Sequence, residues 1–152
     1  MNEEISIGHL FANLCRIQST RASQLLEHIG LHRGQSILLV ILSTEDGLTH
    51  SEIAEKLTIS PAAATKVIKR LEELGYLQRR SDVADERISR VFLKDEGRAV
   101  LEQIHAAFQR IDRMMARGFT PEEQSQLRSL LERLQANLEE QLPASTLSIE
   151  KL

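Results

Sequence analysis

The fold is decided by residues 49–94, which read THSEIAEKLTISPAAATKVIKRLEELGYLQRRSDVADERISRVFLK. This pattern predicts a short helix from Thr49, a turn through Ile59–Pro61, a second helix that ends at Gly75, and then an arginine-bearing β-hairpin. The order of elements is that of a helix-turn-helix followed by a wing. Because a helix braced by a short support helix can enter the major groove of DNA, and a hairpin can reach the backbone or the minor groove, we expect DNA binding.

Local signals fix where the two helices begin. Thr49 and Glu52 have the spacing of a capping box, in which each side chain bonds the other residue's backbone amide, and Thr120 and Glu123 repeat this spacing before the last helix. Ser60 can cap the second helix, and Pro61 suits its first turn, where a missing amide proton costs least. The apolar stripe of this second helix leaves its cations off the buried face; the stripe comprises Ala64, Val67, Ile68, Leu71 and Leu74.

Amphipathic helices flank this region on both sides. Apolar residues recur at helical spacing from Ile7 to about Gly30, from Asp95 to about Gly118, and from Thr120 to about residue 142. Residues 35–43 are apolar nearly all round, which indicates a buried central helix. Strands are expected at Leu77–Arg80 and Ile88–Leu93. The fold class is therefore mostly α with a small β-hairpin wing.

The composition of the 152 residues is ordinary for a protein in water, with 41% hydrophobic and 27% charged residues. The length suits one domain, and no run of about 18 apolar residues is long enough to span a membrane. The acidic start at Glu3 and Glu4 does not resemble a signal peptide. We therefore expect a cytoplasmic protein without a membrane partner.

The net charge of −3 is unevenly distributed along the chain. Residues 60–94 hold eight basic against five acidic side chains, a net charge of +3, which leaves −6 for the remainder. Because the field near a duplex is set by nearby charge, a basic module on an acidic body is compatible with phosphate contacts at one face.

With these elements in order, the chain resembles the MarR family of bacterial transcription regulators over nearly its whole length. The resemblance rests on the support-helix run Ser51–Leu57, the recognition-helix run Ser60–Leu77, and the wing residues Arg79–Asp82 and Asp85–Arg87. The family pattern usually places Leu-Thr before the next helix. Here Leu93 is followed by Lys94, and we expect Asp95 to take over the cap.

The resemblance implies an obligate homodimer whose first and last helices interlock with those of the other chain. We expect one domain over 1–152, with dimerisation helices in 1–32 and 95–142, a winged helix-turn-helix lobe in 33–94, and a tail in 143–152. A two-fold dimer would present its recognition helices to successive major grooves, ~34 Å apart, on a pseudo-palindromic operator. The expected function is that of a repressor. The leucine stripe of the last helix also permits an intrachain core.

The expected partner is double-stranded DNA, and the recognition helix supplies most of the candidate contacts. Side chains near its start can reach base edges, with the alanines offering only methyl contacts, for instance to thymine. Lys69 and Arg70 are better placed for phosphates. Arg70 could instead tie the two helices together. The full set of expected contacts on this helix is Ser60, Ala62, Ala63, Thr65, Lys66, Lys69 and Arg70.

At the wing, Arg87 is expected to contact the minor groove or the backbone, with Asp85 orienting its guanidinium. The alternative for this pair is a surface ion pair of little energetic weight.

The resemblance also implies a cleft between the dimerisation helices and the winged lobe, where relatives bind a small anionic or aromatic effector. His9 and Arg16 on the first helix are the residues we expect to line it. A ligand that prefers a dimer with mis-spaced recognition helices would weaken DNA binding by its ratio of affinities for the two states.

Two alternative functions remain open. Cys15 lies beside Arg16 on the first helix, and a redox-responsive regulator would act through this thiol. The other alternative is a winged-helix module that binds proteins and has lost its affinity for DNA. We expect no cofactor, no metal and no catalysis, because no catalytic motif is present and Gly30 separates His28 from His32.

Overall fold

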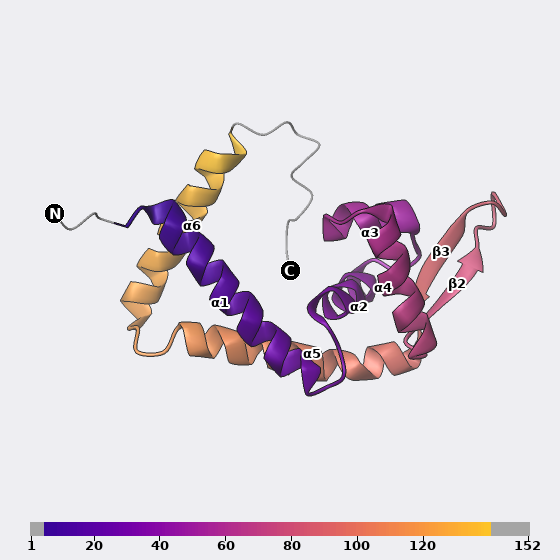
Figure 1. The fold of residues 1–152 in the computed structure, drawn as a ribbon, viewed down its shortest axis with the longest axis horizontal. Coiled ribbons are helices and arrows are strands. Elements are labelled where there is room, and N and C mark those ends of the chain that lie inside the picture. Colours follow the sequence, from indigo (N-terminus) through magenta and orange to yellow (C-terminus); the bar gives the residue numbers. More distant parts are fainter. Residues whose placement is uncertain (1–4, 141–152) are drawn as a thin grey trace.

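The computed structural model describes residues 5–140, which form six α-helices and a three-stranded sheet (Figure 1). Their bounds in chain order are α1 Ile7–Glu27, α2 Arg33–Thr44, β1 Leu48–Thr49, α3 His50–Leu57, α4 Pro61–Glu73, β2 Leu77–Ser81, β3 Ser89–Leu93, α5 Asp95–Met115 and α6 Pro121–Glu139. The expected class, mostly helical with a small β wing, is confirmed. The tail expected at 143–152 lies outside the described residues.

The winged lobe is built around α2. Its leucines Leu38, Leu39 and Leu42 are fully buried, as the run of apolar residues predicted. Helices α3 and α4 pack on it through Ile53, Ile68 and other buried side chains of one continuous core. The sheet closes this core with strand order β1-β3-β2, all antiparallel, and with Leu77 opposite Leu93.

Both predicted capping boxes are present. The Thr49 hydroxyl accepts from the Glu52 amide at 3.3 Å, and the Glu52 carboxylate accepts from the Thr49 amide at 2.7 Å. The hydrogen bonds that the Thr49 amide and the Thr49 hydroxyl donate to the Glu52 carboxylate hold the pKa of Glu52 below its ordinary value. Thr120 and Glu123 repeat the arrangement at the start of α6.

Three local predictions differ from the structure. The short strand β1, which pairs Leu48 with Val91, had no clear pattern in the sequence. Helix α2 begins at Arg33, two residues before the expected start. Asp95 does not cap α5: it is the first residue of the helix, Lys94 occupies the cap position, and no side chain bonds the free amides there. Asp95 and Glu96 in the first turn instead complement the helix dipole.

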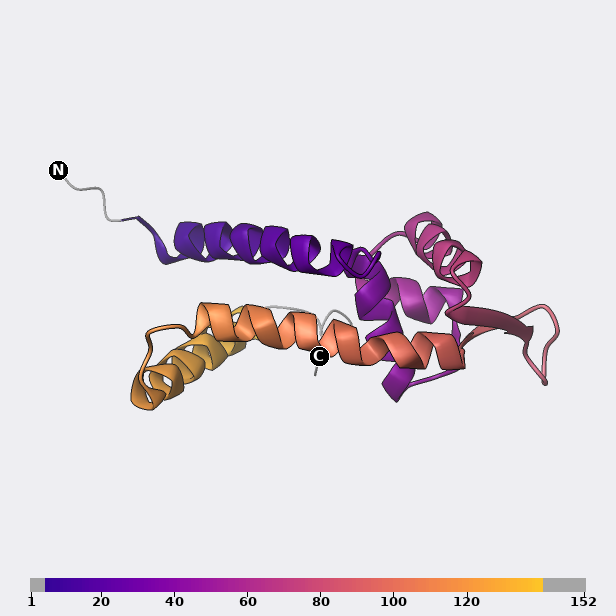
Figure 2. The ribbon, with the colours of Figure 1, turned by 90° about the horizontal axis from the view of Figure 1, so that it is seen from below.

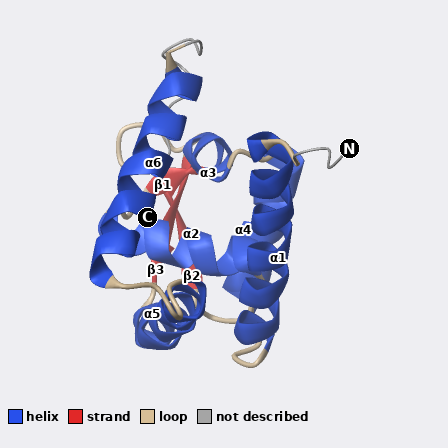
Figure 3. Cartoon of the chain, turned by 90° about the vertical axis from the view of Figure 1, so that its left-hand side faces the viewer, coloured by secondary structure: helices blue, strands red, loops and turns tan. Residues whose placement is uncertain are grey.

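The remaining helices form an arm that extends away from the winged lobe. Helices α1 and α5 pack side by side along the arm, and α6 turns back from the far end of α5 (Figure 2). Seen along the arm, α6 and α1 stand apart on the left and the right, and α5 lies at the bottom, below α6 (Figure 3). Helix α6 buries none of its own residues, and Leu130 and Leu138 are 53% and 69% exposed.

Gly97 joins the arm to the winged lobe. A Cβ atom at this position would lie 2.5 Å from the Tyr76 carbonyl oxygen and 2.6 Å from a Leu93 methyl carbon, which is closer than real contacts allow. The first turn of α5 can pack closely on the base of the hairpin, at Tyr76 and Leu93, because residue 97 lacks a side chain.

We expect Gly97→Ala to lower the free energy of unfolding by about 1–3 kcal/mol, because either α5 or the wing must shift. The matched control is Gly34→Ala in α2, where a new Cβ meets nothing within 4 Å. Alanine there should stabilise by about 0.4–1 kcal/mol. Urea unfolding at one fixed protein concentration measures both; equal effects of the two changes would contradict the close approach at Gly97.

Candidate nucleic-acid interface

Helix α4 has a buried face and an exposed face along its whole length. Ala64, Ile68 and Leu71 are buried in the core. Ser60 caps the helix, its hydroxyl accepting from the Ala63 amide at 3.2 Å, and Pro61 occupies the first position as predicted. The cap and the buried stripe together fix which side of α4 faces outward.

The structure places most of the expected contacts on that outward face. Ala63 is half-buried at its flank, whereas the other six expected positions are exposed: Ser60, Ala62, Thr65, Lys66, Lys69 and Arg70. One face of the helix therefore carries small side chains near its start and cations further along.

Ion pairs divide the cations of this region into two groups. Arg79 holds Glu72 of α4 through two contacts, at 2.7 and 3.1 Å, and so ties β2 to the recognition helix. Arg70 pairs with Glu73 on its own helix at 3.4 Å, not with the support helix. Within residues 5–140, four cations of the region have no acidic partner in contact: Lys66, Lys69, Arg80 and Arg87.

Asp82 organises the loop of the wing. One carboxylate oxygen accepts from the backbone amides of Ala84 and Asp85, at 2.7 and 3.2 Å, and the other accepts from the Arg90 guanidinium. Arg90 also donates to the Gly47 carbonyl oxygen at 2.9 Å, which connects the wing to the turn before β1. We call Asp82, Arg90 and Gly47 the wing brace.

The wing brace is ionic at neutral pH. The Arg90 hydrogen bond, assisted by the two loop amides, holds the pKa of Asp82 below its ordinary value of 3.8. Because the folded-state pKa is depressed, the stabilisation is present above pH 3.8 and is lost as the pH falls below that value. The brace is therefore complete at neutral pH.

Asp85 acts differently from the expectation. Its carboxylate accepts from the backbone amide of Arg87 at 3.0 Å and thus shapes the loop, whereas the expected contact with the Arg87 guanidinium is not formed. An aspartate side chain readily accepts from the backbone amide two residues later, which is the hydrogen bond of an Asx turn. That bond occupies the Asp85 carboxylate, so the Arg87 guanidinium is not held by it. The Arg87 side chain remains exposed on the wing.

Arg80 and Asp82 are two wing residues whose roles were not predicted from the sequence. Arg80 lies directly opposite Arg90 in the hairpin, a like-charge pair that would destabilise it. Each cation has its own neighbour: Arg90 bonds Asp82, and the Arg80 guanidinium stacks over Phe92, 5.0 Å from the ring centre. Arg80 is thereby held on the wing as a further exposed cation.

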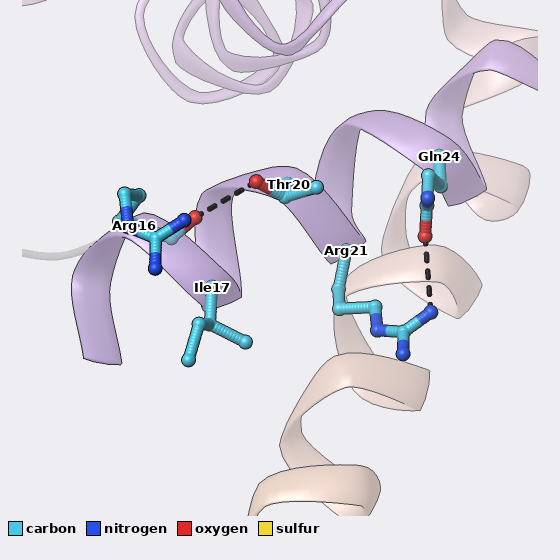
Figure 4. Close-up of a pocket in the computed structure, with 5 residues that line it drawn as sticks. All are labelled: Arg16, Ile17, Thr20, Arg21 and Gln24. Carbon is cyan, nitrogen blue, oxygen red and sulfur yellow. Dashed lines mark hydrogen bonds between the residues drawn. The ribbon is translucent and has the colours of Figure 1, made fainter. Parts of the chain in front are cut away.

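The expected effector residues separate in the structure. Arg16 lines a pocket of about 290 Å³ along α1 with Ile17, Thr20, Arg21 and Gln24 (Figure 4). His9 is exposed two turns earlier and does not line it. Ile17 and Arg21 point toward α5, where they also line a second pocket of about 180 Å³ whose other walls include Ile111, Met114 and Met115.

Cys15 is exposed on α1. His28 and His32 lie at the end of α1 and the start of α2, on different helices. Residues 5–140 contain no cluster of three or more potential metal ligands. Within the same residues, none of the helices has both the length and the apolar character needed to cross a bilayer.

We expect Asp82→Ala to loosen the wing loop, because three donors lose their acceptor at once. The backbone amides of Ala84 and Asp85 should then exchange hydrogen with solvent severalfold faster in NMR measurements, with no change in α4. Asp85→Ala is the matched control, since it removes one acceptor and should affect mainly the Arg87 amide. Unchanged exchange at residues 84 and 85 would contradict the wing brace.

Comparison with known proteins agrees with this geometry. Residues 31–89 match the model of the MarR family. The chain is 30% identical to the uncharacterized HTH-type transcriptional regulator YwoH of Bacillus subtilis, covering 76% of this chain and 83% of that protein. It is 25% identical to the HTH-type transcriptional repressor Rv2887 of Mycobacterium tuberculosis, covering 87% of this chain and 95% of that one.

Among solved structures, the transcriptional regulator SlyA superimposes with a TM-score of 0.74 at 27% identity, covering 89% of this chain and 95% of SlyA. The sequence match, the shared fold and the outward-facing recognition helix agree with one another. The chain belongs to the MarR family of DNA-binding transcriptional regulators, proteins that are not enzymes.

Proposed function

We propose that this protein is a homodimeric repressor that binds a pseudo-palindromic operator. The observation that carries the proposal is the combination, on one chain, of an outward-facing recognition helix and an apolar arm that residues 5–140 leave uncovered. Repression is supported by the relative Rv2887, a repressor that aligns over most of the chain. Because such a protein acts where the chromosome is, the proposal places it in the cytoplasm.

The apolar arm supports the dimer. Large apolar side chains are exposed on one end of the molecule, on α1, on the end of α5, in the turn after it and on α6. We call this set the arm face; it comprises Ile7, Leu10, Phe11, Leu14, Ile17, Met114, Met115, Phe119, Leu127, Leu130, Leu131, Leu134 and Leu138. Single exposed apolar residues are common, but this many large ones at one end of the molecule indicate an interface.

A second copy of the chain is the occupant that we infer for the arm face. The leucines of α6 recur at spacings of three and four, the pattern by which helices pack against each other. A two-fold interface needs the same surface on both partners, and the arm face supplies it. The two winged lobes would then lie apart at the ends of the dimer, as an operator of two half-sites requires.

In the DNA complex, we assign phosphate contacts to Lys69 and Arg70 and base-edge contacts to the start of α4, from Ser60 to Lys66. Arg87 and Arg80 on the wing are assigned to the minor groove or to the adjacent backbone. Arg70 has to exchange its exposed pairing with Glu73 for a phosphate, which costs little because such pairs are weak in water.

The proposal includes release by a small anionic or aromatic effector. Its support is the pair of pockets that share Ile17 and Arg21: polar and cationic residues of α1 line most of the first, and apolar side chains of α1 and α5 line most of the second. Several wall residues also belong to the arm face, so a bound molecule would contact side chains that face the second copy. Its affinity would then depend on the spacing of the two copies, which is the condition for coupling to DNA binding.

The proposal is tested by fluorescence anisotropy with a 30-bp duplex selected from a random pool. We expect tight binding at low salt and a steep loss between 50 and 200 mM salt, because neutralised phosphates release counterions. Arg87→Ala should weaken binding about tenfold without changing the oligomeric state. Arg79→Ala is the matched control with a smaller effect, since Glu72 already holds that guanidinium.

Two results would contradict the proposal. Binding that is absent or independent of salt would favour a protein-interaction module. Equal effects of Arg87→Ala and Arg79→Ala would remove the free wing cation from the mechanism.

A further inference from the structure

The outward-facing edge of α4 changes in character along the helix. Pro61, Ala62 and Thr65 come first, all exposed and all small. Lys66 follows Thr65 directly, and Lys69 lies about one turn beyond Thr65. Because the start of a recognition helix lies nearest the base pairs, the small side chains occupy the positions from which bases are read.

The hydroxyl groups at this end of the helix are engaged within it. The Ser60 oxygen accepts from the Ala63 amide at 3.2 Å. The Thr65 hydroxyl donates its hydrogen to the Pro61 carbonyl oxygen at 3.0 Å. Thr65 therefore has no hydrogen left to offer a base.

The side chains that read bases by paired hydrogen bonds are missing from this edge. Residues 60–65 contain no asparagine, glutamine or arginine, the residues that form bidentate contacts with adenine or guanine. What the edge presents is the Pro61 ring and the methyl group of Ala62, with the Thr65 side chain beside them. Short side chains also allow the helix to approach the floor of the groove closely.

Thymine carries the only apolar group that the major groove offers, its C5 methyl. We propose that the start of α4 reads thymine through these methyl groups, with Ala62 as the main specificity-determining residue. Lys66, one turn further along the same face, is the long polar side chain that reaches a neighbouring guanine at O6 and N7. This inference rests on the proposed DNA binding and assigns the base class that the protein recognises.

Replacement of thymine by deoxyuridine tests the inference, because it removes the C5 methyl and leaves every hydrogen-bonding group in place. The operator is first selected from a random pool of 30-bp duplexes with the full-length protein. Anisotropy then compares the selected duplex with copies that carry deoxyuridine at each half-site thymine. We expect about fourfold weaker binding for each contacted thymine, since a buried methyl group contributes about that factor. Deoxyuridine in the spacer between half-sites is the control and should have no effect.

Two variants separate this contact from a general loss of affinity. Ala62→Gly should bring the ratio between the two duplexes close to one, because the protein side of the contact is gone. Lys69→Ala should weaken binding to both duplexes and preserve the ratio, because a phosphate contact is blind to the methyl group. Because a loss of folded protein lowers binding to both duplexes equally, it cancels in the ratio of the affinities for the thymine and deoxyuridine duplexes.

The possible outcomes are distinct. A half-site without thymine, or equal affinity of the wild type for both duplexes, overturns the inference and leaves the proposed function standing. Retention of the full ratio by Ala62→Gly overturns the assignment to Ala62. Failure to select any duplex contradicts the proposed function, and the inference with it.

Discussion

The leucine face of α6 has no partner within the described part of its own chain, and the rest of the molecule's organisation depends on this constraint. Five leucines, from Leu127 to Leu138, are between 36% and 69% exposed on one side of a well-capped helix. Burial of such a side chain contributes about 1.5–3 kcal/mol, so the face strongly favours association. We infer that a second copy covers it. In such a dimer the two copies of α4 would bind two half-sites of one operator. Modest base contacts by each copy could then add up to specific binding.

Charge is distributed to match this division of labour. The body of the chain has a net negative charge, which supports solubility, while the region of the recognition helix and the wing has a net positive charge. Some cations of this region form ion pairs that hold the lobe together, whereas others have no acidic partner among residues 5–140. Arg79 ties the hairpin to α4, and Arg90 anchors the wing loop to the turn at Gly47. A cation engaged in this way keeps its neighbours in place. Lys66, Lys69, Arg80 and Arg87 form no ion pair within residues 5–140, and we propose that they contact the duplex.

The features predictable from sequence are those that neighbouring residues determine. The capping boxes at Thr49 and Thr120, the start of α4 at Pro61, and the buried character of α2 all follow from spacing along a few turns. Strand β1 was missed because two residues carry no periodicity, and its pairing with β3 joins positions more than 40 residues apart.

The wing brace also depends on a pairing that the sequence does not state, namely the register of the hairpin. Once Ser81 is placed opposite Ser89, residues 82 and 90 become diagonal neighbours, and an Asp and an Arg there would have been recognisable. Two details carried over from the family pattern were wrong: Asp95 does not cap α5, and Asp85 does not contact the Arg87 guanidinium. In both cases the local backbone conformation determines which groups meet, and the motif does not specify that conformation.

Sedimentation analysis of Leu134→Glu tests the two-fold arrangement most directly. Leu134 lies near the middle of the α6 stripe, and Ser129 lies on the opposite side of the same helix, so Ser129→Glu adds the same charge as a matched control. At micromolar concentration, the wild type and the Ser129 variant should both sediment at twice the chain mass of 17.2 kDa, and the Leu134 variant at the mass of one chain. A wild-type protein that sediments as a single chain, or a Leu134 variant that stays paired, would contradict the account.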